Sequence, residues 1–413
     1  MQNTYKMVII GRPNDGKSSI FANFLGDDSV AVSPIPGETK KLETRSINLG
    51  ERNVELIDTP GLQHPETVYL KFKEYAISGK PLLESFCEDF TDSKYAHDIE
   101  IMKALINADI CILTANADNF FGHTSRCLLE SFLLLKNSCV LLGVLNRKDN
   151  SFVNDWRAEF ESRKIPCFDF DAFKSGFKDC ARLLEEIATN EHLRLTPELS
   201  QVLKELKDNR FHLWENNLDN ASLEILNSLK ELMCLEAELV QNSFSLSQEE
   251  RSILVNEEVK NIHEHEKFFR KNLLESFSYS SIKINASNRE ILQSELSIIE
   301  PNWFRRVLGE LPLVSRGKAK CKVSHNGKLP IKFVHNAVLF VQKLLACTYA
   351  QSATREFEIS ISKDEYSLHG IDSFAVENFA YKASKKDESE SFYKLQTTLR
   401  KQIYNVLYRE LSK

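Results

Sequence analysis

The sequence of 413 residues lacks several features that would place it in a special class of proteins. No hydrophobic run reaches the length of about 18 residues that a membrane-spanning helix needs, so no transmembrane segment is expected. The N-terminus has no basic region followed by an apolar core and a small-residue cleavage site, which argues against a secretory signal. The expected location is therefore the cytoplasm, with peripheral attachment to a membrane as the alternative.

Closely spaced cysteines are also absent. The nine cysteines include no CxxC pair, and the two nearest, Cys127 and Cys139, are 12 positions apart. This spacing excludes the usual zinc-binding and dithiol redox motifs. Several cysteines lie in apolar runs, so we expect reduced thiols that pack as small hydrophobic side chains.

Glycine and proline are scarce, at 14 and 11 residues, which excludes collagen-like and low-complexity chains. Charged residues make up 27% and hydrophobic residues 42%, the values of an ordinary globular protein. The net charge of −6 excludes a surface that is basic overall, so any site for a polyanion must be local. The chain is too long for one domain of usual size and predicts two or three.

A phosphate-binding loop is the first motif along the chain. The apolar run of residues 7–10 predicts a buried strand that leads into Gly-Arg-Pro-Asn-Asp-Gly-Lys-Ser at 11–18 and then into a helical pattern. This is the strand, GxxxxGK[ST] loop and helix in which backbone N–H groups and a helix N-terminus bind phosphates. Lys17 is predicted to reach the β- and γ-phosphates and Ser18 to bind Mg²⁺. The predicted nucleotide-binding residues of this loop are Gly11, Asn14, Asp15, Gly16, Lys17, Ser18 and Ser19.

A second strand pattern ends in Asp58-Thr-Pro-Gly61. Asp58 at the end of this strand is predicted to hold Mg²⁺ through a water molecule. The N–H group of Gly61 can contact the γ-phosphate, which makes the following segment a switch between nucleotide states. Gly61 is therefore counted with Lys17 among the predicted catalytic residues.

The base is predicted to be recognised after a third strand, residues 139–145, which ends in Asn146-Arg147-Lys148-Asp149. This run is close to an NKxD motif with Arg147 in the lysine position. The carboxylate of Asp149 can accept hydrogen bonds from N1–H and the exocyclic amine of guanine, a donor pair that adenine lacks. Asn146 belongs to the same motif, and Arg147 can lay its long stem and planar cation over the base.

The order of these motifs, with Pro-Gly-Glu-Thr at 36–39 between the first two, resembles the Era-like branch of the translation-factor-class GTPases. The resemblance covers residues 1–190, and over the whole chain it extends to bacterial GTPases with a helical C-terminal region. It implies that Thr39 closes over Mg²⁺ as a catalytic residue and metal ligand, and that the backbone N–H of Ala172 contacts guanine. It also implies that Asn14 binds a potassium ion, the alternative being that Asn14 only caps the loop.

Leu62 bears on the rate of the reaction that this resemblance implies. It follows Gly61 at the place where Ras-type enzymes have the glutamine that orients the attacking water. A leucine cannot orient water, so hydrolysis is expected to be slow without potassium or another assisting group.

The pattern of elements predicts the fold class. Strand-like runs separated by helical patterns predict a mostly parallel, doubly wound α/β sheet of the P-loop type with its ligand at the carboxyl ends of the strands. These runs are residues 7–10, 42–48, 53–57, 109–114, 139–145 and 166–170. The long interval 62–108 has helical patterns and could act as a lid or partner surface. A mainly α-helical region with a small α+β C-terminal part is expected to follow, which gives predicted domains of 1–190, 191–300 and 301–413.

Amphipathic stretches replace strand signals from about residue 191. Two apolar stripes predict the core of a helical domain rather than a groove for a partner. They consist of Ile225, Leu229, Leu232, Leu235 and Leu239, and of Phe268, Phe269, Leu273 and Phe277. His263 and His265 lack the i, i+4 spacing of metal ligands and are interpreted as part of a solvated helix face.

Residues 301–350 form a basic window of nine cations and one anion, so the window carries +8 and the rest of the chain −14. The cations are Arg305, Arg306, Arg316, Lys318, Lys320, Lys322, Lys328, Lys332 and Lys343. With its interleaved aromatic residues, the window could bind RNA or an anionic membrane surface. The alternative is a basic surface that docks on the acidic remainder of the chain.

The motifs together predict a Mg²⁺-dependent guanine-nucleotide switch, with K⁺ as the candidate second cation. It would hydrolyse GTP to GDP and phosphate and signal its nucleotide state to a protein effector through the helical C-terminal region. Two alternatives stay open: an RNA- or ribosome-associated assembly factor timed by GTP, and a GTP-binding scaffold at the periphery of a membrane.

Overall fold

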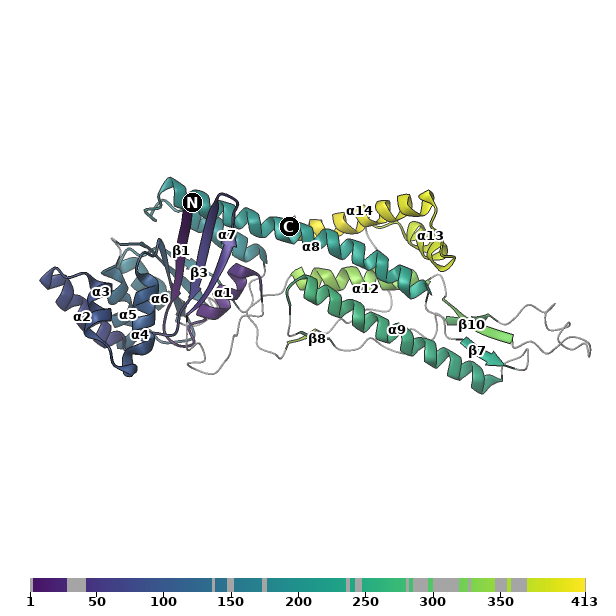
Figure 1. The fold of residues 1–413 in the computed structure, drawn as a ribbon, viewed down its shortest axis with the longest axis horizontal. Coiled ribbons are helices and arrows are strands. Elements are labelled where there is room, and N and C mark those ends of the chain that lie inside the picture. The colour runs from purple at the N-terminus through teal and green to yellow at the C-terminus, as the bar shows by residue number, and fades with distance from the viewer. Residues whose placement is uncertain are drawn as a thin grey trace, which may run out of the picture. The chain divides into compact units, whose positions relative to one another are not determined.

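The computed structural model of the protein is shown in Figure 1. It describes residues 3–27, 42–135, 138–146, 152–172, 177–234, 238–241, 247–279, 282–284, 296–299, 319–325, 328–345, 355–357 and 370–412. The chain divides into two units, and each is described by itself. Unit 1 consists of residues 1–214, 278–281 and 346–355, and unit 2 of residues 215–277, 282–345 and 356–413.

A six-stranded sheet forms the centre of unit 1. Its strands run in the order β2 (Glu43–Asn48), β3 (Arg52–Asp58), β1 (Asn3–Ile10), β4 (Ile110–Asn116), β5 (Val140–Asn146) and β6 (Cys167–Asp169). All neighbours are parallel except β2, which pairs antiparallel with β3. Strand β4 is buried along its whole length, as in parallel strands with both faces covered. The predicted mostly parallel P-loop sheet is therefore confirmed.

Helices cover this sheet and connect its strands. They are α1 (Lys17–Leu25), α2 (Pro65–Ser78), α3 (Leu82–Asp89), α4 (Ala96–Leu105), α5 (His123–Leu133), α6 (Val153–Ser162) and α7 (Phe177–Thr189), with a short 3₁₀ helix at Ser93–Tyr95. The interval 62–108 is helical, as predicted, and contains α2, α3 and α4. Its aromatic side chains join the core of unit 1, where Phe72 and Phe86 meet edge to face at 6.1 Å.

Helix α8 (Pro197–Cys234) begins in unit 1 and ends in unit 2. Its first half is tied to unit 1 by hydrogen bonds from Arg210 to the carbonyl of Leu25 and from Arg52 to Glu205. The division at residues 214 and 215 therefore falls inside a helix, whereas the sequence pattern changes near residue 190, where α7 ends.

Unit 2 is mainly helical. Besides the second half of α8 it contains α9 (Gln248–Ser276), α12 (Lys328–Leu345), α13 (Ser373–Ser384) and α14 (Glu390–Ser412). Its strands are β7 (Glu238–Gln241), β8 (Ile282–Ile284), β9 (Leu296–Ile299) and β10 (Ala319–His325), and β11 (Arg355–Phe357) pairs with β8. We predicted no strands between 191 and 300, but β7, β8 and β9 lie there. Strands of three or four residues are too short for an alternating pattern to reveal them.

The first predicted stripe is only partly helical. Ile225, Leu229 and Leu232 are buried on α8, but the helix ends at Cys234. Leu239 belongs to strand β7, and Leu235 lies outside the described residues. The assignment of all five residues to one helix was therefore wrong, because the apolar spacing continues past the point where the helix ends.

The second stripe and the two histidines also need correction. Phe269, Leu273 and Phe277 are buried, but Phe268 is 60% exposed because adjacent residues of a helix lie on different faces. His265 is not on a solvated face. Its Nε2 lies 2.8 Å from the Oγ of Ser228 and 2.9 Å from the Ser228 carbonyl oxygen, so it links α9 to α8.

The structure tests several other predictions only in part. Seven of the cysteines are free thiols: Cys87, Cys111, Cys127, Cys139, Cys167, Cys180 and Cys234. None of the helices in the described ranges combines the length and apolarity that crossing a membrane requires. Arg305, Arg306, Arg316 and Lys318 of the basic window lie outside the described residues, so the exposure of that window stays a prediction.

Candidate functional site

The predicted motifs meet at one edge of the sheet. Strands β3, β1, β4 and β5 are parallel neighbours, so their carboxyl ends lie at the same edge. Polar residues or loops follow at each end: Asp58 after β3, the loop from Gly11 after β1, and Asn116 and Asn146 at the ends of β4 and β5. This edge is where open α/β sheets bind their ligands.

The phosphate loop leads directly into helix α1, which begins at Lys17. Gly16 has a φ of 91°, and a Cβ atom at this position would lie 2.1 Å from the side-chain nitrogen of Asn146. Only glycine therefore fits at residue 16. Asn146, the first residue of the predicted base-recognition motif, also stabilises the shape of the loop. Its side chain donates a hydrogen bond to the carbonyl of Asp15 at 3.3 Å.

Asp15 points into the loop. Its carboxylate is buried, accepts a hydrogen bond from the backbone N–H of Arg12 at 2.8 Å, and lies 3.5 Å from the Nε of Arg12. Burial raises the pKa of Asp15, and the nearby cations Arg12 and Lys17 oppose this shift. The guanidinium of Arg12 also lies over the ring of Trp156, 5.6 Å from its centre. The carboxylate of Asp15 therefore faces Arg12 instead of a phosphate, and the backbone N–H of Asp15 donates to the Arg12 carbonyl at 3.3 Å.

Lys17 also contacts the phosphate loop. It is only 6% exposed, and its ammonium group donates to the carbonyl of Arg12 at 2.8 Å. Burial lowers the pKa of Lys17, whereas the carboxylates of Asp15 and Asp58 raise it. The ammonium group of Lys17 thus has a neutral carbonyl as its hydrogen-bond partner and lies near two carboxylates. It can exchange this carbonyl for a charged phosphate oxygen when a nucleotide binds.

Ser18 and Asp58 form a pair of hard oxygen donors. The hydroxyl of Ser18 donates to Oδ2 of Asp58 at 2.5 Å. The other oxygen of Asp58, Oδ1, is buried and has no hydrogen-bond partner among the described residues. Mg²⁺ prefers oxygen ligands from one or two protein groups together with water and phosphates. The two residues therefore fit Mg²⁺. Thr39, the third predicted ligand, lies outside the described residues.

We expect Asp58 to make the stability of the metal-free protein depend on pH. Burial raises the pKa of Asp58 to about 6, and the hydrogen bond from Ser18 and the charge of Lys17 oppose the shift. The pKa of Asp58 is higher in the folded protein than in the unfolded one. The contribution of Asp58 to the free energy of unfolding is therefore fully present below about pH 4 and is lost as the pH rises through about 6. The loss is on the order of 3 kcal/mol.

Asp58→Asn should therefore raise the melting temperature by several degrees at pH 8 in EDTA and change it little at pH 4. Melting curves at both pH values check this, with the exposed Asp208→Asn as a control that should melt like the parent at each. An Asp58→Asn variant that melts below the parent at pH 8 would contradict the expected penalty.

The segment after Asp58 lies against the phosphate loop. The backbone N–H of Leu62 donates to the carbonyl of Gly11 at 3.0 Å, and a Cβ atom on Gly61 would lie 2.4 Å from the nitrogen of Pro13. Gly61 therefore permits a contact between the predicted switch and the loop that any larger residue would prevent. The side chain of Leu62 is buried, so it cannot present a polar group to water.

The base-recognition residues are only partly described. Arg147 and Asp149 lie outside the described residues. Asn146 accepts a hydrogen bond from the backbone N–H of Ala172 at 3.1 Å, so it links the phosphate loop to the segment after β6. A guanine oxygen would compete with Asn146 for the same Ala172 N–H group.

Asn116 is a residue of this edge that the motifs did not indicate. Its side-chain nitrogen donates to the carbonyl of Asn14 at 3.3 Å and so supports the tip of the loop. Asn14 itself is exposed and has a φ of 65°. The signal available in the sequence was a polar residue at the end of a mostly apolar strand.

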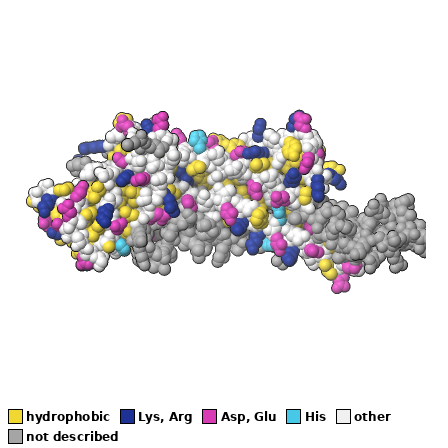
Figure 2. Space-filling view, viewed as in Figure 1, with side chains coloured by type: hydrophobic (Ala, Val, Ile, Leu, Met, Phe, Trp, Pro, Cys, Tyr) yellow, Lys and Arg dark blue, Asp and Glu magenta, His cyan; other side chains and the backbone are white. Residues whose placement is uncertain are grey.

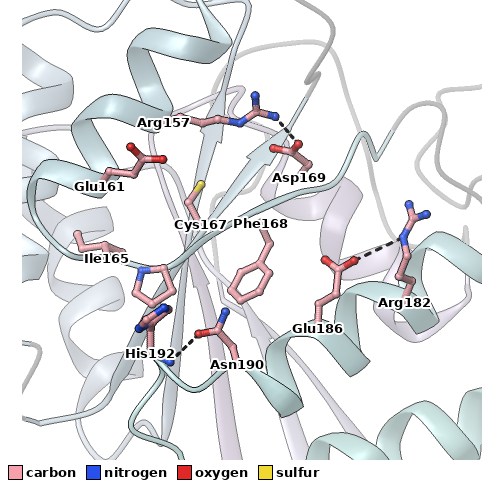
Figure 3. Close-up of a pocket in the computed structure, with 11 residues that line it drawn as sticks. Arg157, Glu161, Ile165, Cys167, Phe168, Asp169, Arg182, Glu186, Asn190 and His192 are labelled. Carbon is pink, nitrogen blue, oxygen red and sulfur yellow. Dashed lines mark hydrogen bonds and ion pairs between the residues drawn. The ribbon is translucent and has the colours of Figure 1, made fainter.

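Two cavities lie at the opposite edge of the sheet. One of about 650 Å³ is lined by Pro166, Cys167 and residues of α6 and α7, and one of about 930 Å³ by Asp109, Val140 and residues near them. These are the amino ends of the strands. In the first, shown in Figure 3, Arg157 pairs with Asp169 and Arg182 with Glu186, so both arginines of the lining already have a carboxylate partner. Neither cavity contains a predicted site residue.

Comparison with known proteins supports this assignment of the edge. Residues 6–144 match the family model described as 50S ribosome-binding GTPase. The chain is similar to proteins named GTPase Der, with 26% identity over 160 residues in Thermoanaerobacter sp., which is 38% of this chain and 31% of the relative. For GTPase Der of Kosmotoga olearia the identity is 38% over 148 residues, 36% of this chain and 28% of the relative. The chain thus spans about a third of the length of these relatives.

Among solved structures, the chain is similar to Era in complex with MgGDPNP and a segment of 16S ribosomal RNA, with a TM-score of 0.34 and 15% identity over 67% of this chain and 90% of that one. A second similar structure is Aquifex aeolicus Era bound to GDP and AlF4⁻, with a TM-score of 0.32 and 15% identity over 66% of this chain and 89% of that one. The family match, the sheet order and the motifs at its carboxyl edge agree: residues 6–144 are similar to the GTPase domain that this family model describes and have a P-loop fold.

Proposed function

We propose that the protein is a guanine-nucleotide switch that hydrolyses GTP to GDP and phosphate and transmits its nucleotide state through unit 2. The observation that supports this most directly is the contact between Ser18 and Asp58, beside the buried ammonium group of Lys17. These residues would hold Mg²⁺ and the phosphates. Mg²⁺ would neutralise the charge that develops on the β- and γ-phosphates.

The reaction can be catalysed without a nucleophilic side chain. Phosphoryl transfer to water depends on positioning and on electrostatic stabilisation. Lys17, the N–H of Gly61 and the start of α1 are the groups of this chain that would provide it, with Thr39 completing the metal site. Gly11, Gly16 and Ser19 would bind phosphate through their backbone N–H groups, and Asn146, Arg147, Asp149 and Ala172 would select guanine.

Phosphate release from GTP by the purified protein tests the proposal. We expect release that requires Mg²⁺, together with tight binding of a fluorescent GDP. Ser18→Ala should lose both the release and the Mg²⁺ dependence, whereas Ser162→Ala on the exposed face of α6 should retain them. No phosphate release and no nucleotide binding by the parent protein would refute the proposal.

Potassium should increase the rate. Asn14 is exposed at the tip of the loop, where its side chain could help hold K⁺ between the α- and γ-phosphates and supply charge to the transition state. We expect the turnover number in K⁺ to exceed that in Na⁺ of equal ionic strength on the order of tenfold. Asn14→Ala should abolish the difference and leave GDP binding nearly unchanged. Equal parent rates in the two salts would make Asn14 a structural residue of the loop.

A ribosome-associated role is the second candidate, because the matching family model is described as a 50S ribosome-binding GTPase. Figure 2 shows Lys and Arg side chains interspersed with Asp and Glu over the described surface of one face. The cations of the window 301–350 are the residues that would bind RNA. Co-sedimentation with ribosomal subunits, in GDP and in a non-hydrolysable GTP analogue, tests this role, and flotation with anionic vesicles tests the membrane alternative.

A further inference from the structure

One buried carboxylate fixes the switch segment that follows Gly61. Asp98 lies in the first turn of α4 and is fully buried. Its Oδ1 accepts hydrogen bonds from the backbone N–H groups of Gln63 at 2.8 Å and His64 at 3.4 Å. Its Oδ2 lies 2.7 Å from Nδ1 of the His64 side chain. A residue 34 positions away thus holds both the backbone and the imidazole of His64.

The contact between His64 and Asp98 sets the tautomer of the histidine. Because a carboxylate can only accept, Nδ1 of a neutral His64 must carry the hydrogen, and Nε2 is left with a lone pair. The ring of Tyr95 meets the imidazole edge to face at 4.9 Å and limits its rotation. No described residue is hydrogen-bonded to Nε2, and the side chain is 27% exposed, so water can reach part of the ring.

The position of His64 in the chain keeps it near the phosphate loop. Leu62 is bonded to Gly11 of that loop, and two residues of extended chain span at most about 7 Å. Leu62 is buried and cannot orient water. Gln63 is exposed, but its side-chain nitrogen donates to the carbonyl of Gly61 at 3.1 Å, which turns it back on its own backbone.

We propose that His64 is a catalytic residue whose Nε2 accepts a hydrogen bond from the attacking water, and that Asp98 is its positioning residue. The inference rests on the proposed GTP hydrolysis. In that reaction the water oxygen forms a bond to the γ-phosphorus. The bond from the γ-phosphorus to the oxygen bridging to the β-phosphate breaks, and GDP leaves with its electron pair. The protons of the water end on the phosphate product or in solvent, and His64 returns unchanged.

The tautomer of a histidine depends on whether its hydrogen-bond partner at Nδ1 is a carboxylate or an amide. An amide in place of the carboxylate would donate to Nδ1, so that Nε2 would carry the hydrogen and could no longer accept one from water. Asp98→Asn keeps an oxygen acceptor for the backbone N–H groups of Gln63 and His64. The variant therefore reverses the tautomer of His64 with little change to the fold. It separates the role of Asp98 in orienting the imidazole from its role in anchoring the backbone.

The test measures the turnover number for GTP and, separately, the affinity for a non-hydrolysable GTP analogue. We expect His64→Ala and Asp98→Asn each to lower the turnover number by about tenfold to a hundredfold, with affinities within about twofold of the parent. His64→Gln should recover most of the rate, because a glutamine oxygen can accept from water. The double variant should be no slower than His64→Ala alone, because both changes remove one interaction. His123→Ala is the matched control, because His123 is an exposed histidine on α5 that pairs with Glu66 of α2.

Each outcome supports one role for these residues and excludes another. If the parent does not hydrolyse GTP, the proposed function itself fails. If the parent turns over and His64→Ala does so at the same rate, the role of His64 is refuted. If Gln63→Ala loses the rate instead, Gln63 orients the water. If Asp98→Asn lowers affinity and melting temperature together with turnover, and His64→Gln restores nothing, the pair only anchors the segment.

Discussion

Lys17→Ala should weaken GTP binding by about a hundredfold to a thousandfold, on the order of 3–4 kcal/mol. The ammonium group of Lys17 is buried near Asp15 and Asp58 and, within the described part of the chain, is held by a hydrogen bond to the Arg12 carbonyl. The variant would leave the phosphates without their nearest protein cation. It would also leave two buried carboxylates facing them with less compensation, so charge repulsion adds to the lost contact.

Titration with a fluorescent GDP and competition by GTP, both in Mg²⁺, measure this effect. The control is Lys103→Ala on the exposed surface of α4, where the ion pair with Glu100 is solvated and contributes little. Circular dichroism should show that both variants are folded. Weakening by less than about tenfold would mean that Lys17 stays on the Arg12 carbonyl when nucleotide binds.

The part of the fold that could be predicted is the part with local signals. The buried parts of β1, β4 and β5 are mostly apolar because both faces of a parallel sheet are covered, and β1 and β5 each lead into a motif of fixed spacing. The phosphate loop needs Gly16 for its own backbone shape, so its pattern is visible in the sequence alone. For these elements, local composition and tertiary packing favour the same structure.

The residues that could not be predicted act over long distances in the chain. Asn116 supports a loop 102 positions before it, and Asp98 holds a segment 34 positions before it. Asp15 fits the motif as a backbone donor, but its inward carboxylate depends on Arg12, and Arg12 in turn on Trp156 of α6. No spacing rule connects such partners, because the fold alone brings them together.

The segments of unit 2 were harder to predict for a different reason. The apolar spacing of α8 continues into Leu239, although the helix ends at Cys234 and the next described residues form a strand. Periodicity reports which residues face a core and does not report where the backbone changes direction. Because α8 also continues across the division between the units, the composition change near residue 190 and that division fall at different places.

GTP should bind about ten-thousandfold more tightly than ATP, and Asp149→Asn should transfer this preference to xanthosine triphosphate. A carboxylate at Asp149 accepts from N1–H and the exocyclic amine of guanine, and adenine would leave it desolvated and unpaired. Asn146 fixes the start of this motif, since its amide is engaged on both sides by Asp15 and Ala172.

Competition of GTP, ATP and xanthosine triphosphate for a fluorescent GDP in Mg²⁺ measures this selectivity. The matched control is Asp155→Asn, an exposed acid in the first turn of α6 that removes the same charge a few residues further along the chain. It should leave all three affinities unchanged. Equal affinity of the parent for GTP and ATP would overturn the guanine assignment. Loss of GTP binding by Asp149→Asn without a gain for xanthosine triphosphate would show that the carboxylate supports the loop instead of contacting the base. Only the pairing mechanism predicts a gain for one base together with a loss for the other, because damage to the loop would weaken every nucleotide alike.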